Sequence, residues 1–297
     1  MTTIAFLGLG HMGGPMARNL VAAGHDVRGF DLVPAALDAA RAGGVQVVEA
    51  ADVAVAEADV VITMLPSGRH VIDAYAGGLL ASARPGTLFI DSSTIAVDEA
   101  REAHRLAEEA GHRAIDAPVS GGVVGAENAT LAFMVGGADD DFQEALPLLE
   151  KMGRRIVHCG GAGLGQAAKI CNNMILGISQ IAVAEAFVLG ERLGLTHQAL
   201  FDVASNASGQ CWALTTNCPV PGPVPTSPAN NDYRPGFAGA LMSKDLGLAE
   251  QAIDLTGVDA KLGRLAREIY REFAEGAGAT TDFSGIINTI RTDSTPA

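Results

Sequence analysis

The sequence predicts an α/β fold in which an N-terminal doubly wound sheet is joined by a long helix to a C-terminal all-α domain. The 297 residues suffice for about two domains at ~150 residues each. Residues 3–160 alternate short β-branched runs with alanine-rich segments, which is typical of βαβ units and a mostly parallel sheet. Beyond residue 165 the helical pattern continues without a convincing strand. We therefore expect domains at 1–163 and 164–297.

The expected strands are short, and some are apolar on both faces, as at residues 60–62. Such strands belong in a parallel sheet that helices cover on both sides. The strands are expected at residues 3–7, 26–30, 45–48, 60–65, 87–90, 113–117, 131–135 and 155–158, with helices that include 12–23, 51–57 and 97–110.

The second half begins with a long helical pattern. Its apolar stretch, residues 174–193, is interrupted by polar and charged side chains, so we expect a buried helix and not a membrane span. Six prolines in residues 218–235 predict a loop, and a loop of that length is usually functional or disordered. The expected helices are 166–193, 198–206, 238–255, 262–274 and 283–290.

Composition narrows the classes of partner. Twenty Lys and Arg against 34 Asp and Glu give a net charge of −14, which disfavours nucleic acid and anionic membranes. The four cysteines have no CxxC spacing and no accompanying histidine cluster. We therefore expect no metal site and reduced thiols in a cytoplasmic protein. The N-terminus lacks the features of a signal peptide.

A GxGxxG motif directly follows the first expected strand and opens a helix. In that context the glycines allow a tight turn, a close approach to a pyrophosphate and tight helix–strand packing. Asp31 follows the second strand, where it would accept ribose hydroxyls and repel a 2′-phosphate, so NAD is favoured over NADP. The alternative is a glycine-rich turn that binds nothing. The expected cofactor residues here are Gly8, Leu9, Gly10, His11, Met12, Gly13 and Asp31.

Three further strand ends carry residues suited to a site, since ligands gather at the carboxyl ends of parallel strands. Leu65 and Pro66 follow the fourth strand, Thr94 follows the fifth, and residues 118–122 follow the sixth. Serine and threonine are also ordinary turn and cap residues, so these loops are as consistent with a structural role.

Lys169 and Asn173 lie one helical turn apart on the long, apolar helix. Alcohol oxidation with NAD needs a group that takes the hydroxyl proton, and no histidine has a suggestive context. A lysine can act where burial and the nicotinamide cation lower its pKa. Asn173 could then orient the amine or the substrate. The alternative is a lysine whose amine reaches solvent.

Two later features remain open on residue chemistry alone. Lys244 and Asp245 adjoin on an amphipathic helix, either as a solvated charge pair or as site residues. Trp212 is the only tryptophan, with core packing as its default role and a pocket wall as the alternative.

Four motifs resemble the β-hydroxyacid dehydrogenases, in the family's order and from residue 4 to about 248. Residues 8–20 resemble the N-terminal signature and residues 116–122 (DAPVSGG) the substrate loop. Residues 163–173 (GLGQAAKICNN) resemble the catalytic segment, and Lys244-Asp245 the late motif. The resemblance implies a Rossmann-type domain, a helical domain that mediates dimers or tetramers, and no metal.

The resemblance also implies residue roles. Lys169 would be the catalytic acid/base, and NAD the cofactor. Leu65, Pro66, Thr94 and Lys244 would contact the nicotinamide half, with Phe237 as a further cofactor contact and pocket wall. The substrate would be bound by Ser120, Gly121, Gly122, Asn173, Trp212 and Asp245.

Within the family, three runs are most similar to members that oxidise 3-hydroxyisobutyrate to methylmalonate semialdehyde in valine degradation. They are residues 169–174, 212–214 and 282–284. Two rivals remain: a sister enzyme acting on tartronate semialdehyde, succinic semialdehyde or glyoxylate, and a dinucleotide-binding sensor without catalysis. The sensor has no need of a proton-transfer group, so Lys169 argues against it.

Overall fold

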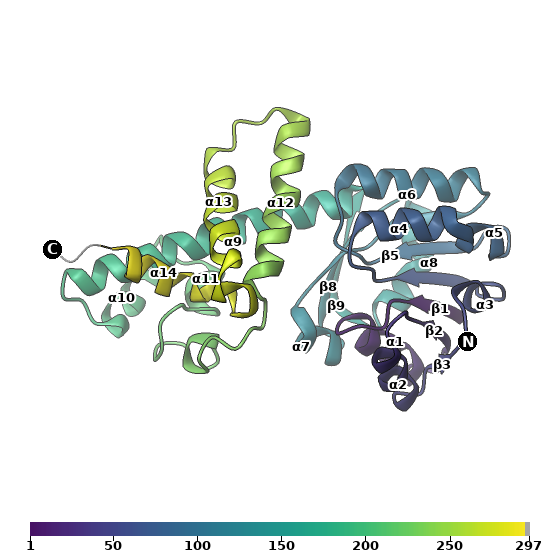
Figure 1. The fold of residues 1–297 in the computed structure, drawn as a ribbon, viewed down its shortest axis with the longest axis horizontal. Helices are drawn as coiled ribbons and strands as arrows, with labels where there is room; N and C mark the ends of the chain where they lie inside the picture. The colour runs from purple at the N-terminus through teal and green to yellow at the C-terminus, as the bar shows by residue number, and fades with distance from the viewer. Residues whose placement is uncertain (295–297) are drawn as a thin grey trace. The chain divides into compact units, whose positions relative to one another are not determined.

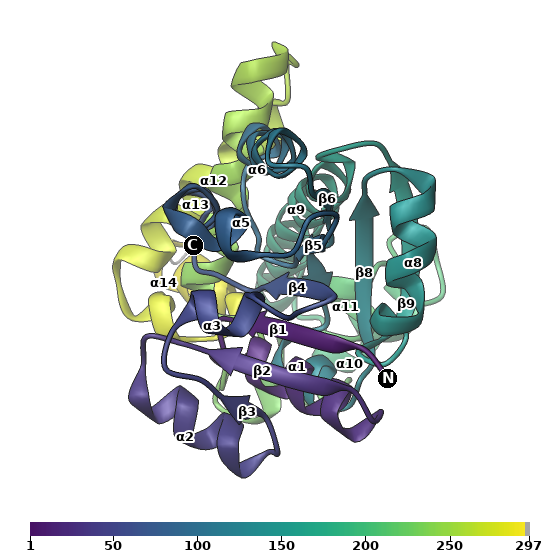
Figure 2. The same ribbon diagram turned by 90° about the vertical axis from the view of Figure 1, so that its right-hand side faces the viewer.

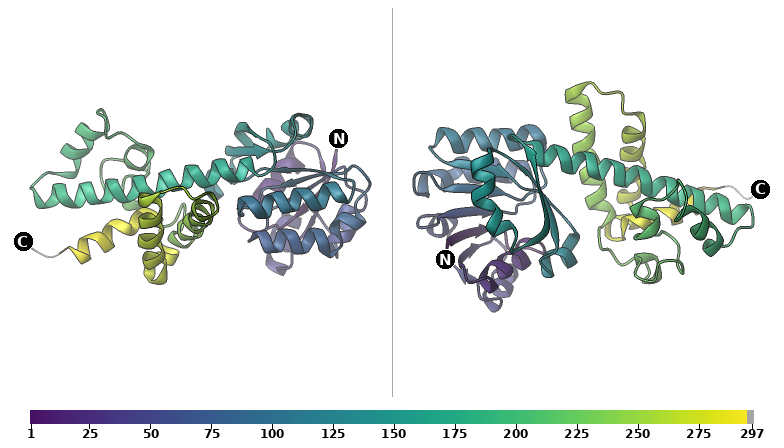
Figure 3. Two further views of the ribbon diagram at one scale, coloured as in Figure 1. Left: turned by 90° about the horizontal axis from the view of Figure 1, so that it is seen from above. Right: turned by 180° about the vertical axis from the view of Figure 1, so that it is seen from behind.

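The computed structural model describes residues 1–294, which form two compact units. The first is Met1–Lys169 and the second begins at Ile170. The division falls inside α9 (Leu164–Arg192), which is one uninterrupted helix (Figure 3). It lies later than the boundary expected at 163/164 because the start of α9 is hydrogen-bonded into the sheet unit, through the main chain of Gln166 and the Asp116 carboxylate.

The first unit contains a nine-stranded sheet in the order β3-β2-β1-β4-β5-β6-β8-β7, with β9 paired to β8. The strands from β3 to β6 are parallel, whereas β8 runs antiparallel to β6 and β7, so the expectation of a mostly parallel sheet is confirmed. The strands are β1 (Thr3–Leu7), β2 (Asp26–Phe30), β3 (Gln46–Val47), β4 (Val60–Thr63), β5 (Leu88–Asp91), β6 (Arg113–Asp116), β7 (Val119–Ser120), β8 (Leu131–Gly136) and β9 (Gly153–Gly160).

Helices cover both faces of this sheet (Figure 1). Successive strand residues point to opposite sides, so in β1 Ile4 and Phe6 pack with one set of helices, and Ala5 and Leu7 with the other. The first set comprises α1 (Gly13–Ala22), α2 (Pro34–Ala42), α7 (Gly122–Glu127) and α8 (Asp139–Leu149); the second comprises α3 (Ala51–Val55), α4 (Gly68–Ala74), η1 (Tyr75–Leu79), α5 (Leu80–Ser82) and α6 (Val97–Glu109).

The carboxyl ends of the central strands form one row across the sheet. Phe30 is paired with Leu7, Leu7 with Thr63, Thr63 with Asp91, and Asp91 with Asp116 (strands in Figure 2). Loops that leave these strands therefore start side by side, at one edge of the sheet. Every candidate residue of the first unit before α9 lies in one of these loops, in β7 and the turn beyond it, or at the first residue of the helix that follows.

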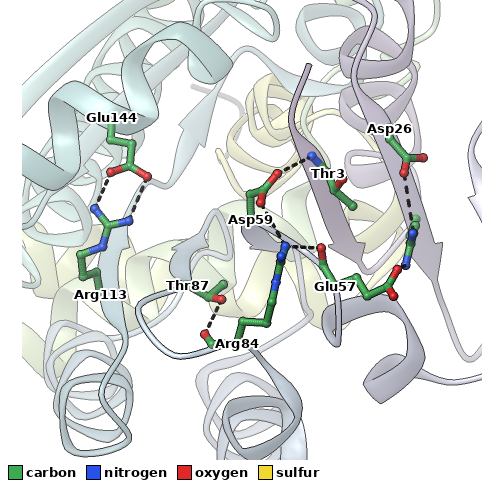
Figure 4. A network of polar contacts seen from close by, with 9 residues as sticks. Thr3, Asp26, Glu57, Asp59, Arg84, Thr87, Arg113 and Glu144 are labelled. Carbon is green, nitrogen blue, oxygen red and sulfur yellow. Dashed lines mark hydrogen bonds and ion pairs between the residues drawn. The ribbon is translucent and has the colours of Figure 1, made fainter.

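The opposite, amino edge of the same sheet is held by charged side chains (Figure 4). Asp59 accepts hydrogen bonds from the Thr3 main chain at 2.9 Å and from Arg84 at 3.0 Å. Arg113 binds Glu144 with both terminal guanidinium nitrogens. This edge carries no residue of the predicted site.

The second unit is helical. Between residues 170 and 294 the structure contains no strand, only one bridge between Ala238 and Asp282. Its core is formed around Phe187, Tyr270 and Phe283. The segment expected as a loop, 218–235, has one turn of 3-10 helix, η2 (Pro228–Asn230). The other elements are α10 (His197–Ala204), α11 (Trp212–Thr215), α12 (Gly239–Thr256), α13 (Lys261–Glu275), η3 (Ala277–Thr280), η4 (Phe283–Gly285) and α14 (Ile286–Asp293).

In the described part of the chain, α9 is the single helix long and apolar enough to cross a membrane. Half of its most apolar window is buried within the protein, as in the core helix of a globular domain. One side of the helix presents Ala184 and Phe187 to the core of the second unit.

Candidate active site

The GxGxxG loop connects β1 to α1, and its three glycines meet different surroundings. Gly8 has a φ of +91°, and a Cβ there would lie 2.2 Å from the Met64 carbonyl oxygen. A Cβ on Gly13 would lie 1.9 Å from the Gly8 carbonyl oxygen. No atom lies within 4 Å of a Cβ built on Gly10. Two glycines are therefore required by packing, whereas Gly10 leaves open space beside the main chain.

That open space fits a pyrophosphate at the start of α1. The first turn of α1 has no acidic residue, so the positive end of the helix dipole is available to an anion. His11 and Gly10 are exposed, Met12 is half-buried and Leu9 is buried. The residues present thus fit the dinucleotide that the sequence predicts.

Asp31 has a second task that the sequence did not indicate. Its carboxylate accepts the Leu9 main-chain N–H at 2.6 Å and the Val33 main-chain N–H at 2.8 Å. The side chain is half-buried at the carboxyl end of β2. Asp31 therefore ties the phosphate loop to β2, and its remaining lone pairs are available to ribose hydroxyls.

The loops after β4 and β5 are joined by a buried hydrogen-bond chain. The Leu65 N–H donates to Ser93 Oγ at 2.8 Å, and Ser93 Oγ donates to Asp91 Oδ1 at 2.6 Å. Thr63 donates to the same oxygen at 2.7 Å. Because the Leu65 N–H turns to Ser93, the strand expected over 60–65 ends at Thr63. Leu65 and the exposed Pro66 are in the first of these two joined loops, and the half-buried Thr94 is in the second, directly after Ser93.

Burial raises the pKa of the Asp91 carboxyl, and the hydrogen bonds from Ser93 and Thr63 oppose that rise. Its second oxygen, Oδ2, is buried and has no hydrogen-bond partner among the described atoms. Asp91 therefore acts as the buried end of the chain that positions Leu65.

Residues 118–122 of the DAPVSGG motif form β7 and the turn into α7 where the sequence predicts only a loop. Gly121 and Gly122 have φ values of +131° and +61°, which side-chain-bearing residues rarely adopt. Ser120 is half-buried at the end of β7, and Gly121 is exposed. The turn brings a hydroxyl and two glycine main chains together, a suitable arrangement for a carboxylate.

Lys169 is 6% exposed, so its side chain does not extend to solvent. Its ammonium donates to the Val119 carbonyl oxygen at 2.8 Å, directly before Ser120 in the chain. The structure therefore brings the predicted acid/base and the predicted substrate loop together within the first unit.

In the second unit, Asn173 and Asp245 form a buried pair. Asn173 Nδ2 donates to Asp245 Oδ2 at 2.5 Å, and the two side chains are 3% and 6% exposed. Asp245 is therefore not part of a solvated charge pair. Lys244 is half-buried beside it on α12.

Phe237 is held by Asp282, whose carboxylate is 1% exposed. Asp282 Oδ2 accepts hydrogen bonds from the main-chain N–H groups of Gly236 and Phe237 at 3.0 and 3.1 Å. The Phe237 ring packs edge-on against the Phe283 ring, with 5.7 Å between the ring centroids. Trp212 begins α11 and is 52% exposed, so core packing is not its role. The binding roles of Trp212 and Phe237 stay predictions.

Sequence reasoning missed the buried polar groups behind the site. The sequence indicates Asp116 only as part of its motif, and it gives His104 no suggestive context. His104 Nε2 lies 3.1 Å from Asp116 Oδ1, and both side chains are buried. The position of Asp116 in the sequence could have indicated its role, because Asp91 and Asp116 each end a strand and the two strands pair in register. Among residues 1–294, the structure gathers no metal-binding group of three or more His, Cys, Asp and Glu side chains.

A doubly wound sheet with a dinucleotide loop, and a buried lysine beside a Ser-Gly-Gly turn, define a pyridine-nucleotide-dependent dehydrogenase. Comparison with known proteins agrees. A family model described as the NAD binding domain of 6-phosphogluconate dehydrogenase matches residues 3–161. A second, described as NAD-binding of NADP-dependent 3-hydroxyisobutyrate dehydrogenase, matches residues 163–290.

Individual proteins match over nearly the whole chain. A probable 3-hydroxyisobutyrate dehydrogenase of Mycobacterium tuberculosis is 62% identical over 98% of both chains. The human mitochondrial 3-hydroxyisobutyrate dehydrogenase is 45% identical, over 99% of this chain and 88% of the human one. An NAD-dependent L-serine dehydrogenase of Pseudomonas aeruginosa is 46% identical over 96% of both.

A solved structure of the M. tuberculosis 3-hydroxyisobutyrate dehydrogenase with L-serine superimposes with a TM-score of 0.96, covering 98% of this chain and 99% of that one. The chain belongs to the 3-hydroxyisobutyrate dehydrogenase family. It is an NAD-dependent hydroxyacid dehydrogenase, and the predicted two-domain fold is confirmed.

Proposed function

We propose that this protein oxidises 3-hydroxyisobutyrate to methylmalonate semialdehyde, as in valine degradation, with Lys169 as the acid/base. The observation that carries the proposal is the contact of 2.8 Å between Lys169 Nζ and the Val119 carbonyl, at the start of the Ser120 turn. In a 3-hydroxy acid the hydroxyl-bearing carbon is two bonds from the carboxylate carbon. An acid/base for that hydroxyl must therefore lie close to the carboxylate site.

In the proposed mechanism, Ser120 and the main chain of Gly121 and Gly122 bind the substrate carboxylate through charge-assisted hydrogen bonds. Bound NAD would supply the acceptor for the hydride that leaves the hydroxyl-bearing carbon. Lys169, as the free amine, takes the hydroxyl proton as the carbon–oxygen double bond forms. Asn173, oriented by Asp245, would direct the substrate oxygen toward Lys169.

A second candidate substrate is L-serine. One relative is named an NAD-dependent L-serine dehydrogenase, and a similar protein was solved with L-serine. Serine is also a 3-hydroxy acid, with an ammonium in place of the methyl branch, so the same carboxylate turn and the same lysine would serve it. The two candidate substrates differ only in this branch, so the side chains that surround it would decide between them.

A panel of short hydroxy acids tests the proposal, with formation of reduced nicotinamide followed by its absorbance. The panel contains both enantiomers of 3-hydroxyisobutyrate, L-serine, glycerate, 3-hydroxypropionate and 4-hydroxybutyrate. We expect the highest kcat/KM with one enantiomer of 3-hydroxyisobutyrate and NAD. A higher value with serine, glycerate or 4-hydroxybutyrate would assign a sister activity. Tight NAD binding with no turnover would favour a sensor.

A further inference from the structure

Gln166, in the first turn of α9, is fully buried and uses both ends of its side-chain amide. Nε2 donates to the Ser93 carbonyl oxygen at 2.7 Å, and Oε1 accepts the Ile95 N–H at 3.2 Å. The two partners flank Thr94, the predicted nicotinamide contact. Because both bonds are to main-chain atoms, they hold the Thr94 backbone from either side.

The main chain of Gln166 is anchored as well. Its N–H donates to Asp116 Oδ2 at 2.9 Å, and the Gly163 N–H donates to Asp116 Oδ1 at 2.8 Å. A Cβ on Gly165 would lie 2.4 Å from the Met134 carbonyl oxygen. The start of α9 is therefore packed directly on the sheet and has little room to shift.

Lys169 lies three residues after Gln166, on the next turn of the same rigid helix. One residue thus connects the loop after β5, the end of β6 and the helix that carries Lys169. The Asp91–Ser93 chain extends this connection to Leu65 in the loop after β4. Two loops of the predicted nicotinamide site and the end of β6 are therefore connected to the same turn of α9.

We propose that Gln166 is a positioning residue that sets the distance between the nicotinamide-binding loop at Thr94 and the amine of Lys169. This inference rests on the proposed role of Lys169. Hydride and proton transfer need reacting atoms about 3–3.5 Å apart, and a misplacement of about 1 Å lowers the rate roughly 10²-fold. Loss of the bridge should therefore lower kcat far more than it weakens NAD binding, because the predicted pyrophosphate and ribose sites lie in the loops after β1 and β2.

The first test is Gln166→Met, which keeps the side-chain length and removes both hydrogen bonds. We expect kcat to fall by about 10- to 100-fold, with the dissociation constant of NAD changed less than about 3-fold. The matched control is Gln180→Met, on the same helix. Gln180 is also fully buried, but its amide has no hydrogen-bond partner among the described atoms. That control should retain the kcat of the unaltered protein.

Gln166→Glu separates positioning from a loss of folding. The ionised carboxylate cannot donate to the Ser93 carbonyl, whereas the protonated carboxyl can donate there and still accept from Ile95. Burial raises the pKa of such a carboxyl. The ratio of variant to unaltered kcat should therefore rise as the pH falls. The effects of the surrounding titratable and charged groups on kcat largely cancel in this ratio, because both proteins contain them. These groups are Asp91, Arg101, His104, Asp116 and Lys169.

Unchanged kcat in Gln166→Met would overturn the proposal. So would a loss of activity that matches the loss of folded protein, with a flat pH ratio for Gln166→Glu. These outcomes differ from failure of the proposed function, in which Lys169→Ala keeps its turnover. All rates are measured with the best substrate of the panel, so a change of substrate does not affect the test.

Discussion

The two edges of the same sheet are built in opposite ways. At the carboxyl edge, the Asp31, Asp91 and Asp116 carboxylates accept hydrogen bonds from main-chain N–H groups, and Asp91 and Asp116 are at most 4% exposed. At the amino edge, the Arg84–Asp59 and Arg113–Glu144 pairs join long side chains that are 39–53% exposed (Figure 4).

The difference shows what each edge contributes. An exposed ion pair gives about 0–1 kcal/mol and tolerates many geometries. A buried carboxylate is strongly destabilising if its partners are lost, so it holds the loops around it in one arrangement. The carboxyl edge is therefore suited to positioning a cofactor, and substitutions there should affect activity more than equivalent changes at the amino edge.

The largest effect is expected for Lys169→Ala. Removal of a general acid/base typically lowers the rate by 10²–10⁴-fold, so we expect kcat to fall by about 10³-fold. NAD affinity, measured by titration calorimetry, should change little, because the dinucleotide loop is untouched. Turnover close to that of the unaltered protein would contradict the role of Lys169.

The next effect compares two glycines of one loop. Gly13→Ala places a Cβ 1.9 Å from the Gly8 carbonyl oxygen. We therefore expect the free energy of unfolding, measured by urea denaturation, to fall by about 3 kcal/mol. Gly10→Ala meets open space and should leave stability unchanged within about 0.5 kcal/mol. It should nevertheless weaken NAD binding about tenfold, by filling the pyrophosphate space. Equal stability losses in the two variants would refute this distinction.

A smaller effect is expected for Asp31→Asn. The amide keeps one acceptor for the loop and removes the charge that repels a 2′-phosphate. The preference for NAD over NADP, measured as the ratio of kcat/KM values, should fall about tenfold, or about 1.4 kcal/mol. If the unaltered protein already uses NADP as well as NAD, Asp31 does not determine the choice.

The smallest effect is expected at the amino edge. The hydrogen bond from Arg113 holds the pKa of Glu144 below its usual value. The pair therefore stabilises the fold fully above the usual pKa of a glutamate. This contribution is lost as the pH falls through the lowered pKa of Glu144 in the folded protein. Glu144→Gln should lower the unfolding free energy by about 0.5 kcal/mol at neutral pH, a difference that vanishes in acid. A changed kcat in this variant would contradict the inference that activity depends on the carboxyl edge of the sheet and not on the amino edge.

Much of the fold followed from the sequence because its signals are local. The expected strands 3–7 and 26–30 coincide with β1 and β2, since β-branched runs and flanking turns lie within a few residues of each other. The strand expected over 60–65 was too long, because the Leu65 N–H bonds to a serine in another loop. The two-residue β7 was not expected, since its pairing with β8 is not visible in its own residues.

The sequence by itself determined the dinucleotide loop, the order of the two domains and the choice of Lys169 as the candidate acid/base. These depend on glycine spacing, hydrophobic period and motif order, which can be read along the chain. Only the tertiary structure decided that Gln166 meets Ser93 across 73 residues and that Asn173 meets Asp245 across 72. Such pairs depend on how strands and helices pack, because a buried polar group takes its partner from whatever the fold brings within hydrogen-bond distance.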